Sequence, residues 1–440
     1  MTSVSAPPAP TTTGNSLTRV VAASMVGTVI EWYDFFIFGA MSALVLGPVF
    51  FPSDNTAVST FAALATFAVA FFVRPLGAVV LGHFGDRVGR RSPLVVALLL
   101  MGVSTMVVGL LPTYSQVGAL APTLLVLCRV VQGFALGGEY GGAVLMVVEN
   151  AQAKNRRGFF GAFLGAASPI GFLLATAVIT LTGLLSTEEQ MATWGWRIPF
   201  LTSAIMVGIG LYIRLKLEES DSFKQLQAQA EASPATVRRA PFFDMLRSHP
   251  VEVLKSITVP LGVHTGYYMT TVFLLSFARD HGGFSVDEAS SMVMLAAVSF
   301  LTFILVGGHW SDRAPRWVPM VVGLAGFAGS VFAMFPMVSS GSYWTAALAF
   351  ALGLAFMGLL YGPLNTYMAE LFRGAVRYTG VSFGYQVAGA VAGGLTPVIA
   401  VPLLAQTGSH VPVAGFAAIV MVISFSGLML RRNRSNWQHS

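Results

Sequence analysis

Long apolar stretches alternate with short polar ones along the whole chain. Each apolar stretch is about 20 residues or longer, the length of α-helix that crosses the hydrocarbon core of a bilayer. The pattern therefore predicts twelve transmembrane helices, near residues 20-46, 56-81, 93-111, 120-148, 158-183, 195-215, 250-279, 286-307, 318-338, 343-369, 376-404 and 410-430.

Helices are the expected form of these stretches. They are too long for transmembrane β-strands, and lipid leaves the backbone few other ways to satisfy its hydrogen bonds. The composition agrees: 55% of the residues are hydrophobic and 10% are charged, whereas a soluble protein carries about 25% charged residues. We therefore expect an all-α membrane protein and exclude a water-soluble fold.

A polar segment, 216-249, divides the predicted helices six and six. We expect two pseudo-symmetric six-helix bundles, 19-215 and 250-430, joined by this segment as a cytoplasmic linker. An internal repeat supports the division, because GHFGDRVGRR at 82-91 returns in shorter form as GHWSDRAPR at 308-316. The ends, 1-18 and 431-440, are expected to be cytoplasmic tails. The first is expected to be disordered and to contain no signal peptide.

The basic residues indicate the orientation of the chain. One predicted side of the membrane holds all of the 25 Lys and Arg residues except Arg74, Arg129, Arg197 and Arg279. By the positive-inside rule that side is cytoplasmic, and it includes both termini. The net charge of +6 is thus explained by topology, and we expect no nucleic-acid partner. The single cysteine, Cys128, excludes an intramolecular disulfide.

Five charged residues lie inside predicted helices, away from the helix ends: Glu31, Asp34, Arg74, Arg129 and Glu139. A charge at the bilayer centre costs about 2.5–3.5 kcal/mol on insertion scales, so such residues usually line a cavity or pair with one another. Glu31 and Asp34 share one helix face, and Arg129 shares another with Gln132 and Glu139. Together with Arg74, the charges are expected to form one polar column. The alternative is a set of ion pairs that only fixes helix packing.

Several motifs resemble those of the major facilitator superfamily. GHFGDRVGRR fits its loop 2-3 pattern and RVVQG (129-133) its helix 4 pattern. Within it, the chain is similar to the metabolite:proton symporter family through EWYDF (31-35), RPLG (74-77), RVVQGFALGGEYGGA (129-143), WGWRIPF (194-200) and GYQVAGAVAGG (384-394). Members import shikimate, 2-oxoglutarate, citrate, other carboxylates, or proline and betaine. Overall similarity favours the shikimate-permease-like branch.

The resemblance implies a central cavity lined by helices 1, 4, 7 and 10. It suggests Asp34 and Arg129 as an ion pair, with Asp34 as the first candidate for the coupled proton, then Glu31 and Glu139. Protonation would free Arg129 to bind a substrate carboxylate. Arg74 would anchor the substrate or help to close the cytoplasmic gate. The other candidate substrate-binding residues are neutral: Gln132, His264, Tyr267, Tyr268, Tyr361, Asn365, Tyr385 and Gln386.

The predicted cytoplasmic loops resemble loops of the superfamily that gate the central cavity. Asp86 would face a helix N-terminus of the other half, where a negative charge is favoured. Glu149 with Arg156 and Glu370 with Arg377 would supply ion pairs between the halves. Further gating candidates are Arg87, Arg90, Arg91, Asp312 and Arg313. The alternative is that these basic residues serve topology alone.

The leading hypothesis is a proton-coupled symporter that imports a small organic acid across the plasma (inner) membrane as a monomer. A symporter for proline or betaine, a drug:proton antiporter and a sensor built on a transporter fold remain alternatives. No P-loop, nucleophile elbow or zinc spacing occurs, so we predict neither an enzyme nor a metal site, and no cofactor beyond the proton gradient. The glycine-rich stretch GFALGGEYGGA is expected to allow close helix packing.

Overall fold

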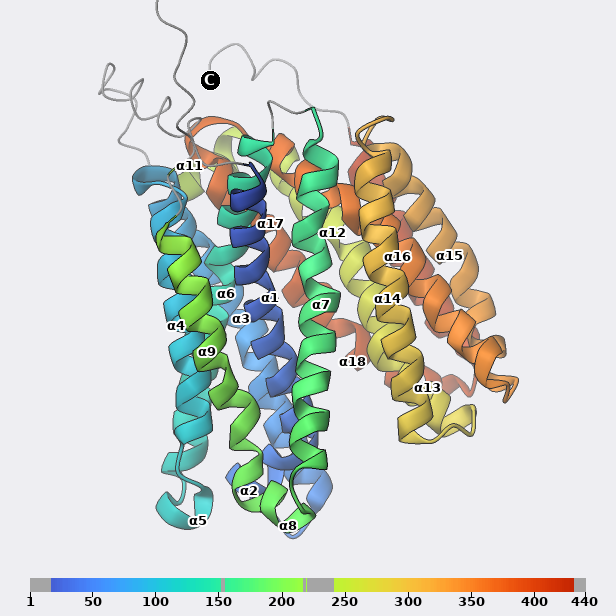
Figure 1. Ribbon diagram of the computed structural model, residues 1–440. Coiled ribbons are helices and arrows are strands. Elements are labelled where there is room, and N and C mark those ends of the chain that lie inside the picture. The colour runs from blue at the N-terminus through green and yellow to red at the C-terminus, as the bar shows by residue number, and fades with distance from the viewer. Residues whose placement is uncertain (1–16, 152–154, 217–218, 220–240, 431–440) are drawn as a thin grey trace, which may run out of the picture.

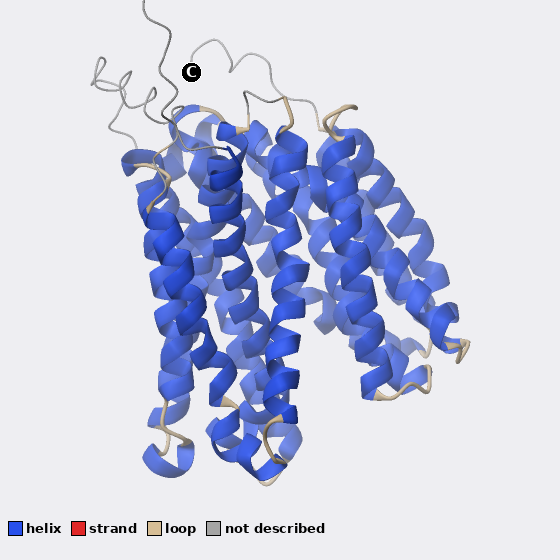
Figure 2. Cartoon of the chain, in the orientation of Figure 1, coloured by secondary structure: helices blue, strands red, loops and turns tan. Residues whose placement is uncertain are grey.

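The computed structural model describes residues 17–440 apart from 152–154, 217–218, 220–240 and 431–440. The described residues form helices joined by short loops, and none of them forms a strand (Figure 2). The predicted tails fall outside this part of the chain, except that Leu17 and Thr18 already belong to the first helix. The all-α prediction is confirmed.

The first half contains six long helices that follow the predicted stretches closely. Its helical elements are α1 (Leu17–Met41), η1 (Ser42–Leu46), α2 (Gly47–Phe50), α3 (Thr56–Val88), α4 (Arg91–Leu110), α5 (Tyr114–Val117), α6 (Leu120–Asn150), α7 (Arg157–Leu184), α8 (Glu188–Gln190), η3 (Met191–Gly195) and α9 (Arg197–Leu215).

The second half repeats this arrangement. Its helical elements are α11 (Pro241–Ser248), α12 (Pro250–Tyr268), η5 (Met269–Phe273), α13 (Leu274–His281), α14 (Val286–Trp310), α15 (Trp317–Ser339), α16 (Tyr343–Leu371), η6 (Gly374–Val376), α17 (Arg377–Ala388), η7 (Gly389–Gly393), α18 (Gly394–Thr407) and α19 (His410–Met429).

Eleven helices of the described chain are long and apolar enough to cross a membrane. The remaining predicted span, 250-279, runs without a break through α12, η5 and α13. It is less apolar than the others because Glu252, Lys255 and His264 lie on α12. A helix that presents polar groups to a cavity cannot be apolar on every side. The twelve-helix prediction therefore agrees with the structure.

Helix α11 was not predicted. It forms the last part of the proposed linker 216-249, and most of the rest of that linker lies outside the described residues. The side chain of Met245 is fully buried, and the ring of Phe242 packs 5.1 Å from that of Phe383 on α17. An eight-residue helix is too short to give a clear periodic signal in sequence, which explains the omission.

The two halves pack side by side, with α3 against α17 and α7 against α14 and α16 (Figure 1). Helices α4, α7, α15 and α17 all begin at the end of the bundle where α11 lies. We call this end the basic end, because Arg91, Arg157, Arg316 and Arg377 lie at the starts of these helices.

The glycine-rich stretch of α6 allows close packing, as predicted. A side chain at Gly133 would collide with the backbone of Ala70, and one at Gly137 would collide with the backbone of Arg74. Helix α3 therefore crosses α6 at van der Waals distance of its backbone. This crossing fixes the height of Arg74 in the bundle.

Candidate functional site

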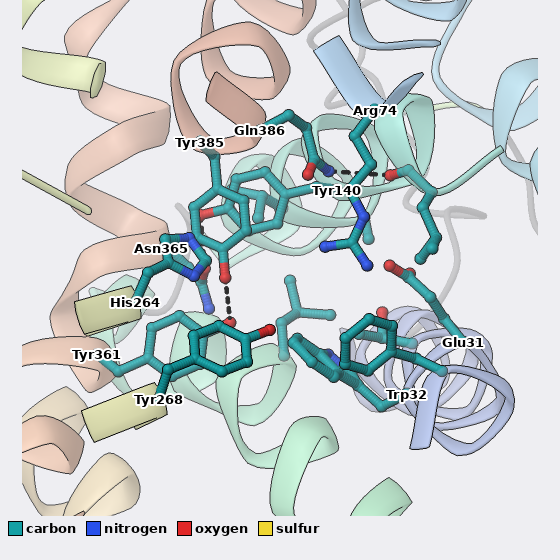
Figure 3. A pocket seen from close by; sticks show the side chains of 16 residues that line it. Glu31, Trp32, Arg74, Tyr140, His264, Tyr268, Tyr361, Asn365, Tyr385 and Gln386 are labelled. Carbon is teal, nitrogen blue, oxygen red and sulfur yellow. Dashed lines mark hydrogen bonds between the residues drawn. The ribbon is translucent and has the colours of Figure 1, made fainter. Parts of the chain in front are cut away.

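A central pocket lies between the two halves (Figure 3). The empty space between its lining atoms, including the part open to solvent, is about 590 Å³. Its lining comes from α1, α3, α6 and α7 of the first half and from α12, α16 and α17 of the second.

The charged side of the pocket belongs to the first half. The guanidinium of Arg74 and the carboxylate of Glu31 point toward each other (Figure 3). The guanidinium carbon of Arg74 lies 4.3 Å from the ring centre of Phe71 and 5.0 Å from that of Phe35. These two rings hold the cation by cation–π attraction. The hydrogen-bonding edge of Arg74 is thereby directed toward the pocket.

The opposite side of the pocket is neutral. The hydroxyls of Tyr361 and Tyr385 are hydrogen-bonded at 2.9 Å, and the ring of Tyr140 stacks on that of Tyr385 at 3.7 Å. The hydroxyl of Tyr140 donates to Asn365 Oδ1 at 2.9 Å. The aromatic groups and amides thus form a single connected surface.

His264 lies beside this surface, with its ring centre 4.9 Å from that of Tyr385. Its Nε2 has no hydrogen-bond partner in the described structure. Gln386 donates from Nε2 to the carbonyl of Leu136 at 3.0 Å, and Tyr268 completes the wall. The neutral substrate-binding candidates therefore line the pocket, apart from Tyr267 and Gln132.

Tyr267 does not line the pocket. Its ring packs 5.5 Å from that of Phe300 on α14, and its hydroxyl lies within hydrogen-bonding reach of Ser168 on α7. Tyr268, the next residue, is turned by about 100° around the helix and lines the pocket instead.

The predicted direct ion pair between Asp34 and Arg129 is wrong. The hydroxyl of Thr105 donates to Asp34 Oδ2 at 2.9 Å and accepts from Gln132 Nε2 at 2.9 Å, and Arg129 Nη1 donates to Gln132 Oε1 at 2.7 Å. The sequence gives no signal for Thr105 on α4 as a partner, because it does not specify which helix faces Asp34. We call these four residues the sealed network.

The sealed network does not line the pocket. Each of its four side chains is fully buried. The guanidinium carbon of Arg129 lies 4.0 Å from the ring centre of Phe38 and 5.2 Å from that of Phe67, and its Nη2 donates to the Phe67 carbonyl at 3.3 Å. Arg129 is therefore enclosed by aromatic rings, and the expected single polar column is divided in two.

The predicted contact of the first loop copy with the other half is present at the basic end. Asp86 accepts hydrogen bonds from the backbone N–H groups of Tyr378 and Thr379, at 2.9 and 3.0 Å, and from the Thr379 hydroxyl at 2.8 Å. These donors belong to the N-terminus of α17 in the other half. Arg90 pairs with Asp86 at 3.4 Å from within the first half.

The second loop copy makes the symmetric contact. Asp312 accepts from the backbone N–H groups of Gly158 and Phe159 at 2.7 and 2.8 Å, at the N-terminus of α7. Each half thus places one aspartate against a helix N-terminus of the other, where the backbone dipoles favour a negative charge.

Ion pairs between the halves accompany these contacts. Glu149 pairs with Arg377 at 3.0 Å, and Glu370 pairs with Arg157 at 3.7 Å. These partners differ from the expected pairs of Glu149 with Arg156 and Glu370 with Arg377. Arg156 is exposed, and Arg157, which begins α7, makes the contact with the second half.

The remaining basic candidates have other surroundings. Arg90 also lies 3.6 Å from Glu149, inside the first half, and its guanidinium carbon lies 5.9 Å from the ring centre of Tyr378 in the second half. Arg91 donates from its side chain to the carbonyl of Leu215. Arg87 and Arg313 are exposed, as expected of residues that serve topology. Arg316, which was not predicted, donates twice to Glu370 at 2.7 Å.

A model of one large family matches most of the chain. Residues 24–397 match the Major Facilitator Superfamily. The chain belongs to this superfamily. The predicted resemblance to this superfamily is confirmed, and so is the prediction that the protein is a transporter and not an enzyme. Among the described residues, no group of three or more His, Cys, Asp or Glu side chains could hold a metal ion.

Relatives within the superfamily are metabolite transporters. Inner membrane metabolite transport protein YhjE of Escherichia coli strain K12 is 39% identical, over 90% of this chain and 89% of its own. The Shikimate transporter of the same strain is 37% identical, over 88% and 87%. The Proline/betaine transporter of Salmonella typhimurium strain LT2 is 31% identical, over 92% and 82%. This major facilitator is therefore a member of the metabolite:proton symporter family.

Solved structures of the proton:xylose symporter XylE share its fold. The form bound to 6-bromo-6-deoxy-D-glucose gives a TM-score of 0.73 at 18% identity, over 93% of this chain and 94% of that one. The inward-open form gives 0.62 at 16% identity, over 96% and 98%. The twelve-helix architecture of a multi-pass membrane protein is thus established.

One charged residue of this facilitator was missed. Arg214 was assigned to the cytoplasmic surface, yet its side chain is 2% exposed and pairs with Glu139. Lys216, two residues later, is exposed. Both follow the same apolar stretch, so the sequence alone gives no signal that separates them. The pairing also explains why Glu139 does not line the pocket.

Proposed function

We propose that this transporter is a proton-coupled symporter that imports a small organic acid by alternating access of its two halves. The observation that carries the proposal is that Arg74 and Glu31 face each other in the pocket between the halves. A guanidinium binds a carboxylate with two parallel hydrogen bonds. Protonation of Glu31 would release Arg74 for a substrate carboxylate, so that proton and anion bind together.

The neutral side of the pocket is suited to a small solute that carries a ring or hydroxyl groups. Tyr361, Asn365 and His264 offer donors and acceptors at a distance from the single cation, while the aromatic rings offer apolar surface. A shikimate-like carboxylate fits this division into a charged side and a neutral side. One relative is a Shikimate transporter.

We place the protein in the plasma (inner) membrane with its basic end in the cytoplasm, following the positive-inside rule. The contacts of Asp86 and Asp312 would then hold the cytoplasmic side closed. The pocket is built within one chain, which supports a monomer as the working unit. The driving force would be the proton gradient, with no bound cofactor.

A zwitterion such as proline or betaine is the second candidate. Trp32, Tyr268 and Glu31 line the pocket together, and aromatic faces next to a carboxylate attract a quaternary ammonium. A Proline/betaine transporter is among the relatives.

The test is a screen in liposomes that contain the purified protein. A pH gradient with the acid side outside is imposed, and uptake of shikimate, protocatechuate, 2-oxoglutarate, citrate, proline and betaine is measured with and without a protonophore. We expect one carboxylate to accumulate only while the gradient lasts. Accumulation of proline or betaine alone would select the second candidate, and absence of any gradient-dependent uptake would overturn both.

A further inference from the structure

A second pair of opposite charges lies behind the pocket. Glu139 on α6 and Arg214 on α9 are 1% and 2% exposed. Arg214 Nη2 donates to Glu139 Oε1, and Arg214 Nη1 donates to the carbonyl of Leu94 at 2.6 Å. Neither side chain lines the pocket. The substrate site as described above gives this pair no role.

Gly27 brings Arg214 close to the pocket wall. A side chain at Gly27 would occupy the position of the Arg214 guanidinium. Gly27 precedes Glu31 by four residues on α1, so the two positions are neighbours on one helix face. The guanidinium of Arg214 therefore lies one helical turn from Glu31, held in place by α1, the Leu94 carbonyl and Glu139.

The carboxyl group of Glu31 lies within electrostatic reach of Glu139, Arg74 and Arg214. We call these four residues the charge cluster. Arg74 faces Glu31 in the pocket and is available to a solute, whereas Arg214 is paired with Glu139 and is enclosed by protein.

We propose that Glu31 and Glu139 hold the coupled proton between them, and that Arg214 is the fixed counter-ion that keeps Glu139 ionised. This inference rests on the proposed symport. When a solute carboxylate binds Arg74, Glu31 loses its counter-ion and faces an ionised Glu139. Two close carboxylates in a low-dielectric site do not both stay charged. A proton from the outer solution then binds Glu31, whose O–H donates to Glu139.

Release reverses these steps. When the solute leaves Arg74 on the other side of the membrane, the guanidinium attracts the Glu31 carboxylate again, and the proton departs to that side. Arg214 takes no part in the exchange, because its hydrogen bonds and its packing against Gly27 hold it in place. Arg214 is thus a positioning residue that acts through Glu139.

Other titratable groups also face the pair. They are Asp34 on α1, Tyr361 on α16 and Tyr378 on α17. Tyrosine hydroxyls are neutral near pH 7, and Asp34 interacts with Glu139 rather than directly with Glu31. The charge that decides proton binding at Glu31 therefore comes from Glu139, Arg74 and Arg214.

The test is an infrared pH titration of the purified full-length protein in lipid, without solute, in which the C=O band of a protonated carboxyl is followed. The Glu31→Gln variant should lose the band. In Glu139→Gln the midpoint should move to lower pH by about one unit, because two close carboxyls interact by at least that much. In Arg214→Gln it should move to higher pH, because Glu139 then takes the proton itself.

The double variant Glu139→Gln/Arg214→Gln keeps the net charge of the pair and guards against misfolding of Arg214→Gln. Its midpoint should also lie below that of the wild type, but by less than in Glu139→Gln, because Glu31 then loses the nearby Arg214 cation as well. A band that survives in Glu31→Gln, or midpoints unmoved in Glu139→Gln and in the double variant, would overturn the inference. Gradient-driven shikimate uptake by the wild type, measured in parallel, tests the symport separately, since the infrared midpoints need no transport.

Discussion

The sealed network and the charge cluster contain similar residues from the same half of the molecule, yet their surroundings differ. Asp34 and Arg129 are joined through Thr105 and Gln132 and are enclosed by protein. Glu31 and Arg74 line a pocket between the halves. A buried charge does work in transport only where a solute or a proton can reach it. We therefore propose a structural role for the sealed network and a role in proton coupling for the charge cluster.

Replacing the two acids of α1 one at a time tests this assignment most strongly. In Glu31→Gln the side chain mimics the protonated acid, so we expect gradient-driven accumulation to fall to the level seen without a gradient. Exchange of labelled for unlabelled solute should continue, because exchange requires no net movement of protons across the membrane. Asp34→Asn is the matched control and should retain accumulation. If Asp34→Asn loses accumulation and Glu31→Gln keeps it, the assignment is reversed.

The two arginines offer the next comparison. Arg74→Lys keeps the charge but loses the two parallel hydrogen bonds to a carboxylate. A hydrogen bond to a charged group contributes about 1.5–3 kcal/mol, so affinity for the transported acid should fall roughly 10- to 100-fold. Binding is measured by calorimetry or by the concentration dependence of exchange.

Arg129→Lys serves as its control. Arg129 has no contact with the pocket, so folded Arg129→Lys protein should bind the acid within about threefold of the wild type. An equal loss of affinity in both variants would show that the sealed network reaches the solute during the transport cycle.

Thr105 links the sealed network, and its hydroxyl has two partners there. Thr105→Ala leaves a carboxylate oxygen of Asp34 and an amide N–H of Gln132 buried without a partner, at a cost of about 1–3 kcal/mol. Thermal unfolding in detergent should move down by several degrees, while affinity for the solute stays unchanged. Thr105→Ser retains the hydroxyl and should restore most of the stability. A change of affinity without a change of stability would contradict a structural role.

The sequence predicted the helices well because the signal is local. A bilayer requires about 20 apolar residues in a row, and every predicted stretch from 20-46 to 410-430 has its counterpart in the structure. The contacts of Asp86 at the start of α17 were also within reach, because the motif that contains Asp86 carries its own resemblance. Short amphipathic α11 lacked such a signal.

The charged residues were predicted less well, because depth along a helix does not fix the direction around it. Glu31 and Asp34 differ by three positions and share one face of α1, yet one lines the pocket and the other contacts α4. Their partners depend on which helices flank α1, and this is a property of the packed bundle. Arg214 was missed for the same reason, since Gly27 and Leu94 lie far from it in sequence.

Two tyrosine hydroxyls allow the same comparison between the pocket and the sealed network, with the smallest expected effects. The hydroxyl of Tyr361 is hydrogen-bonded to that of Tyr385 in the pocket. The hydroxyl of Tyr33, the residue before Asp34, donates to the Pro199 carbonyl at 2.9 Å. A neutral hydrogen bond contributes about 0.5–1.5 kcal/mol. Tyr361→Phe should therefore weaken solute binding roughly two- to tenfold with little change in thermal unfolding. Tyr33→Phe should lower the unfolding temperature and leave binding unchanged. If Tyr33→Phe weakened binding as much as Tyr361→Phe, the region around Asp34 would be coupled to the pocket, and the division into a structural and a functional group would fail.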